Sequence, residues 1–170
     1  MTGMGQFEAA APRPADRRDL PALAALWFDG WQDAHRTILP REIAADRTLA
    51  SFDARLTRNI GAVRTIGDVG KPLGFSPITG RELNQFYVNR DARGTGVARS
   101  LIVDAEARLR EAGVTVAWLA CAIGNDRAAR FYEKFHWRRA GVDTIALPLG
   151  SGTFHLDVWR YERDLTAAHP

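Results

Sequence analysis

The chain has 170 residues, the size of one ordinary domain, and 46% of them are hydrophobic and 25% charged. These fractions are typical of a globular protein and exclude disordered and fibrous classes. One cysteine, Cys121, excludes an intrachain disulfide framework and fits a cytoplasmic protein. No apolar run approaches the roughly 20 residues of a membrane span, and residues 1–7 lack the features of a signal peptide.

The net charge is +3, from 23 basic and 20 acidic residues, and all but two of the basic residues are arginine. An excess of arginine can accompany phosphate or nucleic-acid recognition, because the guanidinium fork matches phosphate oxygens. No block of five like charges occurs in the chain. We therefore expect no basic tail that binds nucleic acid.

The first part of the chain is predicted to be mainly helical. Leu20, Leu23 and Trp27 share a helical face, and Phe52 and Leu56 begin a similar stripe further on. The predicted elements are a loose lead-in over residues 1–12, a helix over 16–28, a connector over 31–40 and a second helical region over 42–60. One domain is predicted over residues 13–165, with a tail over 166–170, and any strand before the first helix is expected to be weak.

The rest of the chain alternates strands and helices. Gly113 and Gly67 mark a helix end and a turn, and the segment between Val88 and Val114 is long enough for the crossover of a parallel strand pair. Strands are predicted over residues 62–66, 73–78, 83–88, 114–123, 138–147 and 154–163, helices over 97–109 and 125–135, and a flexible loop over 148–152. This order predicts a mixed α/β (α+β) fold.

A glycine-containing loop joins the predicted strand at residues 83–88 to a strong helix. Free backbone amides at a helix N-terminus attract anions, and Gly94 and Gly96 let a phosphate approach the backbone closely. The loop lacks the Gly-Lys-Ser/Thr end of a P-loop. A dinucleotide fingerprint is also disfavoured, because Arg99 stands where its third glycine belongs. A turn without any ligand remains an alternative.

Two motifs resemble the GNAT superfamily of acyl-CoA-dependent N-acyltransferases. The segment Arg93-Gly94-Thr95-Gly96-Val97-Ala98 is similar to its Arg/Gln-x-x-Gly-x-Gly/Ala motif. The segment from Asn125 to Tyr132 is similar to its Asn-x-x-Ala-x-x-Phe-Tyr motif. The resemblance extends over residues 13–163. It departs at His136, which replaces the usual glycine and would have to adopt a left-handed helix end.

The resemblance implies a mostly antiparallel sheet with one splayed parallel pair, flanked by helices. The pantetheine arm of acetyl-CoA, a cosubstrate, would lie in the gap between the strands at 83–88 and 114–123. The backbone of Tyr87 and Val88 would bond the arm and polarise the acetyl carbonyl, and Asn125 would contact the arm while capping its helix. The pyrophosphate would be bound by the backbone of Arg93, Gly94, Thr95, Gly96, Val97 and Ala98.

The resemblance also implies the catalytic groups. Tyr132 would protonate the thiolate of coenzyme A, the alternative being a tyrosine that only packs against the sheet. Glu82 is the best placed base for the attacking amine, with a solvated surface glutamate as the alternative and His35 and His155 as weaker candidates. Cys121 is expected to be a buried, inert thiol. No metal is indicated, because His and Cys show no ligand spacing.

The acceptor is expected between the first two helices and the last hairpin. Trp31, Asp33 and His35 would line one side and residues 149–154 the other. The acceptor would be a primary amine of a small molecule, a peptide N-terminus or a lysine, with no nucleic-acid or membrane partner. The resemblance further implies a possible homodimer. The alternative function is a non-catalytic acyl-CoA-binding or regulatory module.

The positive charge is concentrated near these motifs. Residues 81–99 contain four arginines and two acids, and residues 126–139 contain four arginines, Lys134 and two acids. These two segments together carry +5, so the rest of the chain carries −2. The placement fits an anionic nucleotide cosubstrate, whose approach such a field would steer.

Overall fold

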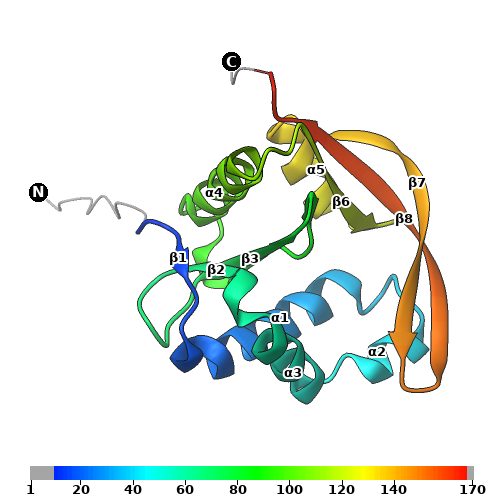
Figure 1. The fold of residues 1–170 in the computed structure, drawn as a ribbon. Helices are drawn as coiled ribbons and strands as arrows, with labels where there is room; N and C mark the ends of the chain where they lie inside the picture. Colours follow the sequence, from blue (N-terminus) through cyan, green and yellow to red (C-terminus); the bar gives the residue numbers. More distant parts are fainter. Residues whose placement is uncertain (1–9, 168–170) are drawn as a thin grey trace, which may run out of the picture.

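The computed structural model describes residues 10–167, which form one mixed sheet with helices on both faces (Figure 1). The strand order is β1-β2-β3-β4-β6-β8-β7, and β5 pairs with β3. Every pair is antiparallel except β4 with β6, as the sequence predicted for the fold class. The strands are β1 (Arg13–Pro14), β2 (Val63–Ile66), β3 (Gly74–Thr79), β4 (Glu82–Leu83), β5 (Tyr87–Val88), β6 (Val116–Ala122), β7 (Arg138–Leu149) and β8 (Gly152–Asp164).

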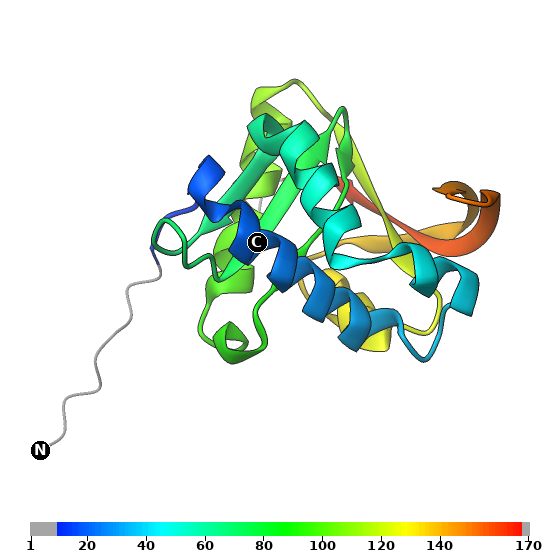
Figure 2. The ribbon, with the colours of Figure 1, turned by 90° about the horizontal axis from the view of Figure 1, so that it is seen from below.

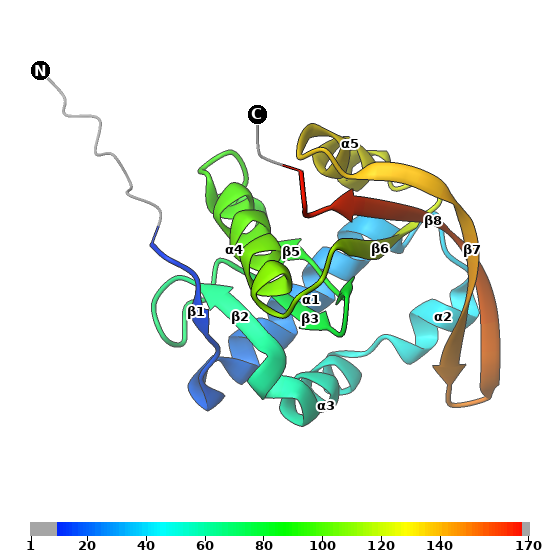
Figure 3. The same ribbon diagram turned by 45° about the horizontal axis from the view of Figure 1, so that its top comes forward.

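The helices divide between the two faces of the sheet. α1 crosses one face with α3 beside it, which Figure 2 shows from below, while α4 and α5 lie on the opposite face (Figure 3). The helices are α1 (Leu20–His35), α2 (Arg41–Asp46), α3 (Leu49–Asn59), α4 (Val97–Glu111) and α5 (Asp126–Lys134). Short 3-10 turns lie at Arg17–Asp19, Ile60–Ala62 and Arg90–Ala92.

Hydrophobic clusters on the two faces of the sheet hold these layers together. One lies under α1 and α3 and is built around Trp27. The ring centroids of Phe52 and Phe75 are 4.6 and 5.5 Å from that of Trp27. Another lies under α4 and α5 and contains Ile102, Trp137 and other fully buried side chains. Because apolar burial stabilises both faces, the sheet is fixed as the central layer.

Two helix predictions were wrong in extent. α1 continues to His35 because Trp27 and Trp31 extend its buried stripe by one further turn, so the predicted connector over 31–40 is partly helical. The predicted helix over 42–60 is broken between Asp46 and Leu49. Thr48 ends the break as the N-cap of α3, its hydroxyl oxygen accepting a hydrogen bond from the Ser51 amide at 3.1 Å.

The predicted strand over 83–88 was also wrong, because it is two short strands separated by a bulge. Ile78 pairs with Leu83, while Phe75 pairs with Tyr87, so the register on β3 shifts by one residue between β4 and β5. Pro77 lies at the shift, and it has no amide proton to donate to a regular ladder. The extra residue turns the backbone of residues 84–86 away from regular pairing.

Two turns complete the comparison with the sequence. His136 has a φ of 65°, the left-handed helix end that the missing glycine requires. The predicted flexible loop over 148–152 is wrong in extent, because β7 reaches Leu149 and β8 begins at Gly152. The lead-in at residues 1–9 and the end of the tail at 168–170 lie outside the described residues. Within residues 10–167 no helix is both long and apolar enough to cross a bilayer.

Candidate active site

The sheet opens between β5 and β6. Glu82 and Trp118 are the register pair of β4 with β6, and the Trp118 amide donates to the Arg81 carbonyl at 3.1 Å. Beyond this point, within the described part of the chain, residues 119–122 of β6 pair with β8, and β5 pairs with β3. The parallel pair therefore splays apart, as predicted, and leaves strand edges that face each other across a gap.

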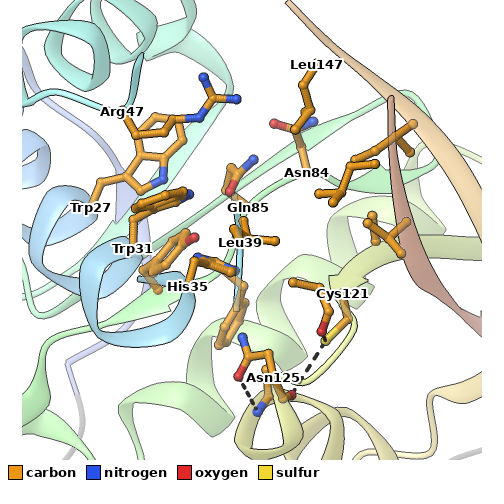
Figure 4. A pocket seen from close by; sticks show the side chains of 18 of the residues that line it. Trp27, Trp31, His35, Leu39, Arg47, Asn84, Gln85, Cys121, Asn125 and Leu147 are labelled. Carbon is orange, nitrogen blue, oxygen red and sulfur yellow. Dashed lines mark hydrogen bonds between the residues drawn. The ribbon is translucent and has the colours of Figure 1, made fainter. Parts of the chain in front are cut away.

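A cavity of about 270 Å³ occupies this region. Its walls come from α1, the α2–α3 connection, the β4–β5 bulge, the end of β6, α5 and the last hairpin (Figure 4). Most of the lining is aromatic or aliphatic. The polar and ionisable lining residues are His35, Arg47, Arg55, Glu82, Asn84, Gln85, Tyr87, Cys121, Asn125 and Tyr132. An apolar cavity with a few polar groups is the usual form of a small-molecule site.

Tyr132 lies on α5 and lines the cavity at the side of β6. Its side chain is 8% exposed, and its ring packs near Phe131 and Phe86, with centroids at 5.6 and 6.3 Å. Within the described residues its hydroxyl has no hydrogen-bond partner. Burial raises the pKa of Tyr132 above its usual value, so the phenol keeps its proton at neutral pH.

Glu82 lies at the start of β4, where the parallel pair begins to separate, and it also lines the cavity. Its side chain is partly buried. Burial raises the pKa of this carboxyl, against the opposing effects of the Asn84 side chain and of Arg160. A carboxylate with a raised pKa is a better proton acceptor than a solvated one.

Of the three residues predicted to bind the acceptor, two line the cavity and one does not. Trp31 and His35 line the cavity, and their rings are 5.3 Å apart. Burial lowers the pKa of His35 to about 4, so its imidazole is neutral at pH 7. Asp33 points elsewhere, because neighbouring positions on a helix face different directions, and it forms ion pairs with Arg90, Arg93 and Arg127 at 2.7 to 3.1 Å.

The glycine loop lies beside this Asp33 cluster. Gly94 and Gly96 have φ values of 76° and 92°, and a β-carbon added at either would meet no atom within 4 Å. Among residues 10–167, the amides of Gly94, Gly96, Val97 and Ala98 donate to no carbonyl or side chain. Thr95 instead bonds back to the Ala92 carbonyl through both its amide and its hydroxyl. Free amides beside open space can receive an anion.

Asn125 and Cys121 lie at the end of β6, near the start of α5. The Asn125 side chain accepts a hydrogen bond from the Ala128 amide at 3.3 Å and caps the helix, and it also lines the cavity (Figure 4). Cys121 is 4% exposed, which confirms the predicted burial. Burial raises the pKa of its thiol to about 12, so thiolate is scarce at neutral pH.

The remaining predicted positions lie at the edges of this region. Tyr87 and Val88 form β5 on one side of the gap, and the Tyr87 ring packs against Phe75 inside the core. His155 is exposed on β8 and does not line the cavity. Within residues 10–167 no group of three or more His, Cys, Asp and Glu side chains is arranged to hold a metal ion.

Sequence reasoning missed Arg47 and Arg55. Arg47 falls in the break between α2 and α3, and Arg55 lies one turn beyond Phe52 on α3. Both side chains line the cavity. Arg47 lies on the side of the cavity away from Cys121 and Asn125 (Figure 4). In the sequence they are two arginines among many. The helix break at residues 47–48, which places Arg47, was not predicted from the sequence.

The fold is that of N-acetyltransferases. A GCN5-related N-acetyltransferase from Rhodopseudomonas palustris matches with 21% identity, a TM-score of 0.71, and coverage of 92% of this chain and 96% of that chain. An N-acetyltransferase from Staphylococcus aureus matches with 23% identity, a TM-score of 0.64, and coverage of 91% and 97%. The PaiA N-acetyltransferase from Thermoplasma acidophilum, solved in complex with coenzyme A, matches with 16% identity, a TM-score of 0.60, and coverage of 90% and 97%. A search of the curated proteins gives no match.

The sequence itself gives the family. The model of the acetyltransferase (GNAT) family matches residues 21–137, which is more than half of the chain. This protein therefore belongs to the GNAT acetyltransferase family, as the resemblance of its two motifs predicted.

Proposed function

We propose that this protein transfers the acetyl group of acetyl-CoA directly to a primary amine. The observation that carries the proposal is the placement of Glu82 and Tyr132 on one cavity in the gap between β5 and β6. The glycine loop with its free amides supplies the anion-binding site that the coenzyme's phosphates need.

The residues present fit acetyl-CoA as a cosubstrate. The open space beside Gly94 and Gly96 leaves room for a pyrophosphate, with Arg93 beside the loop. The free edge of β5 and the Asn125 side chain offer hydrogen bonds to the amides of a pantetheine arm. Acetyl-CoA when bound supplies an acetyl thioester, which is an activated acyl group.

The proton chemistry falls to the two ionisable residues on the cavity. Glu82 accepts the proton that the amine must lose when its nitrogen forms the new bond to the acetyl carbon. Tyr132 donates its phenolic proton to the sulfur as the carbon–sulfur bond breaks, which leaves coenzyme A as the neutral thiol. No acyl-enzyme is needed, which agrees with the inert character of Cys121.

Thermal shift and thiol release test the proposal together. Acetyl-CoA should raise the melting temperature, and a panel of primary amines should release coenzyme A from it in proportion to acetylated product. Tyr132→Phe should keep the thermal shift and lower kcat by about 100-fold.

Tyr161→Phe is the matched control, because its ring lies 6.0 Å from that of Tyr132 but its hydroxyl contacts Arg139 and Glu133 and not the cavity. It should leave kcat within a few-fold of the wild type. A thermal shift without turnover of any amine would show a non-catalytic acyl-CoA-binding protein instead.

A further inference from the structure

The cavity contains a buried cation that is incompletely paired. Arg47 is 5% exposed, and its Nη1 is buried and makes no hydrogen bond. The nearest acidic oxygen in the described residues is Oδ2 of Asp46 at 3.6 Å, which is beyond hydrogen-bond distance. A guanidinium that is removed from water and incompletely paired is costly, so a native structure retains it where a ligand supplies the missing acceptor.

A second guanidinium lies on the same side of the cavity. Arg55 projects from α3, and its guanidinium carbon is 6.0 Å from the ring centroids of both Trp27 and Phe52. In the part of the chain that the structure describes it forms neither a hydrogen bond nor an ion pair. Burial lowers the pKa of both Arg47 and Arg55, and the negative charge of Asp46 opposes this effect only in part.

The same cavity also contains an acidic group. Glu82 lines it where the parallel pair of β4 and β6 begins to separate. A cationic amine is therefore favoured near Glu82 and an anion near Arg47. The rest of the lining is mostly apolar. It includes Trp31, Leu39, Ile43, Ile145, Leu147 and Leu156.

The hairpin borders the cavity. Residues 152–157, the part of β8 that precedes Val158, extend past β6 and pair with β7 alone among the described residues. The turn of the hairpin meets α2, where the Gly150 amide donates to Oδ1 of Asp46 at 2.9 Å. A cavity of about 270 Å³ bordered in this way suits a small acceptor better than a folded protein.

We propose that the acceptor is a free apolar amino acid, whose carboxylate is bound by Arg47 and Arg55 while its amino group faces Glu82. This inference rests on the proposed function and specifies its substrate class. Two guanidinium groups can hold a carboxylate through charge-assisted hydrogen bonds, and the aromatic and aliphatic wall receives the side chain. The reaction is the transfer already described, so the amino nitrogen gains the acetyl group and the carboxylate is unchanged.

The experiment measures kcat/KM of the wild-type protein for matched acceptor amines, with acetyl-CoA as the acetyl donor. The probes are leucine, leucinamide and isopentylamine, and phenylalanine, phenylalaninamide and 2-phenylethylamine. The members of each series share a side chain and differ in the carboxylate. We expect kcat/KM to be at least about 10-fold higher for the two amino acids than for their amides and decarboxylated amines.

Variants then locate the recognition. Arg47→Met and Arg55→Met should each raise KM for the amino acids by about 10-fold or more, with little change for the decarboxylated amines or in KM for acetyl-CoA. Arg47→Lys should recover part of the loss, because lysine keeps the charge but not the fork. Arg58→Met, an exposed arginine on the same helix that does not line the cavity, is the matched control. Arg55→Met and the wild-type amine comparison stand even if Arg47→Met fails to fold.

The outcomes separate the two proposals. Equal or faster acetylation of the amides and amines overturns the amino-acid inference and leaves the acetyltransferase function intact. An equal loss for amino acids and amines in the arginine variants also overturns it, because it indicates a structural role. If acetyl-CoA produces a thermal shift but neither series is acetylated, the amino-acid inference is wrong. The proposed function is wrong as well only if no amine of the wider panel is acetylated.

Discussion

Two carboxylates in this chain have opposite pKa shifts for opposite reasons. Glu82 is partly desolvated at the cavity, which raises its pKa, and its opposing partners are weaker than its burial. Asp19 is completely buried, yet the hydrogen bond from Arg13, at 2.8 Å, with the amides of Asp16 and Gly70, holds its pKa at about 2. The first environment suits a proton acceptor, and the second suits a fixed structural anion.

The pH profile of the reaction tests the role of Glu82. The carboxylate must be ionised to accept a proton, so kcat should fall as the pH decreases through its raised pKa, above the ordinary value of 4.5. Glu82→Gln should lower kcat by about 100-fold and remove this acid limb. Glu42→Gln, an exposed acid on α2, serves as the control and should keep both rate and profile. An unchanged acid limb in Glu82→Gln would assign the base elsewhere.

Asp19 gives a prediction on stability. Because its pKa is depressed from 3.8 to about 2, its contribution is complete above pH 3.8 and is lost as the pH falls through 2. Asp19→Asn should lower the free energy of unfolding by about 3 kcal/mol at pH 7, since it leaves Arg13 and buried amides poorly paired. Urea unfolding at pH 7 and pH 2 measures this, and the difference between the proteins should shrink at pH 2. A constant difference would rule out the ionised form as the cause.

At the scale of elements, the start of α4 is the site proposed for the phosphates of coenzyme A. Gly96 caps this helix in a left-handed conformation beside open space, and its absent side chain leaves the amides accessible. The β4–β5 bulge acts in a similar way at the other end of the gap, since it carries residues 84–86 into the cavity wall. Irregular backbone thus occurs at both places where a ligand must approach the sheet.

Two glycines of the same helix test this directly. Gly96→Ala adds a β-carbon in the space beside the free amides and should weaken acetyl-CoA binding by about 10-fold or more, measured by calorimetry. Gly113→Ala is a close control, because Gly113 follows the C-terminus of α4 with a φ of 82° and open space around it. Both should lose about 1 kcal/mol of stability from left-handed strain. Equal affinities in the two variants would show that the loop is not the phosphate site.

At the scale of the whole molecule, the two basic segments of the sequence come together. Asp33 on α1 pairs with Arg90 and Arg93 from the first segment and with Arg127 from the second. A net charge of only +3 therefore includes a local positive region next to the glycine loop. Such a region attracts a polyanionic ligand from a distance.

The salt dependence of association measures this field. The on-rate of coenzyme A, followed by stopped flow, should decrease steeply between low and physiological ionic strength, because the Debye length falls to about 8 Å at 0.15 M. Pantetheine lacks the phosphates and is the control ligand. Its on-rate should barely respond to salt. The same response for both ligands would argue against electrostatic steering.

Much of the fold followed from local patterns. The glycine loop, the strong helix after it, the Asn125 cap and the splayed pair were predicted, and the structure places them as expected because each depends on near neighbours in the chain or on the family motifs. The errors arose where distant packing overrides local preference. α1 extends beyond its predicted end because Trp31 is buried in the core on its last turns. The predicted strand at 83–88 is interrupted where it lies opposite Pro77.

The sequence by itself determined that this is a mixed α/β fold with a glycine-containing loop between a strand and a helix, because strand and helix periodicity, helix capping and glycine conformation are local properties. The tertiary structure alone decided the acceptor side of the cavity. It turned Asp33 away toward three arginines and brought Arg47 and Arg55 into the lining of the cavity. These placements depend on contacts between residues far apart in the chain, and no local pattern encodes which charged side chain ends up buried and incompletely paired.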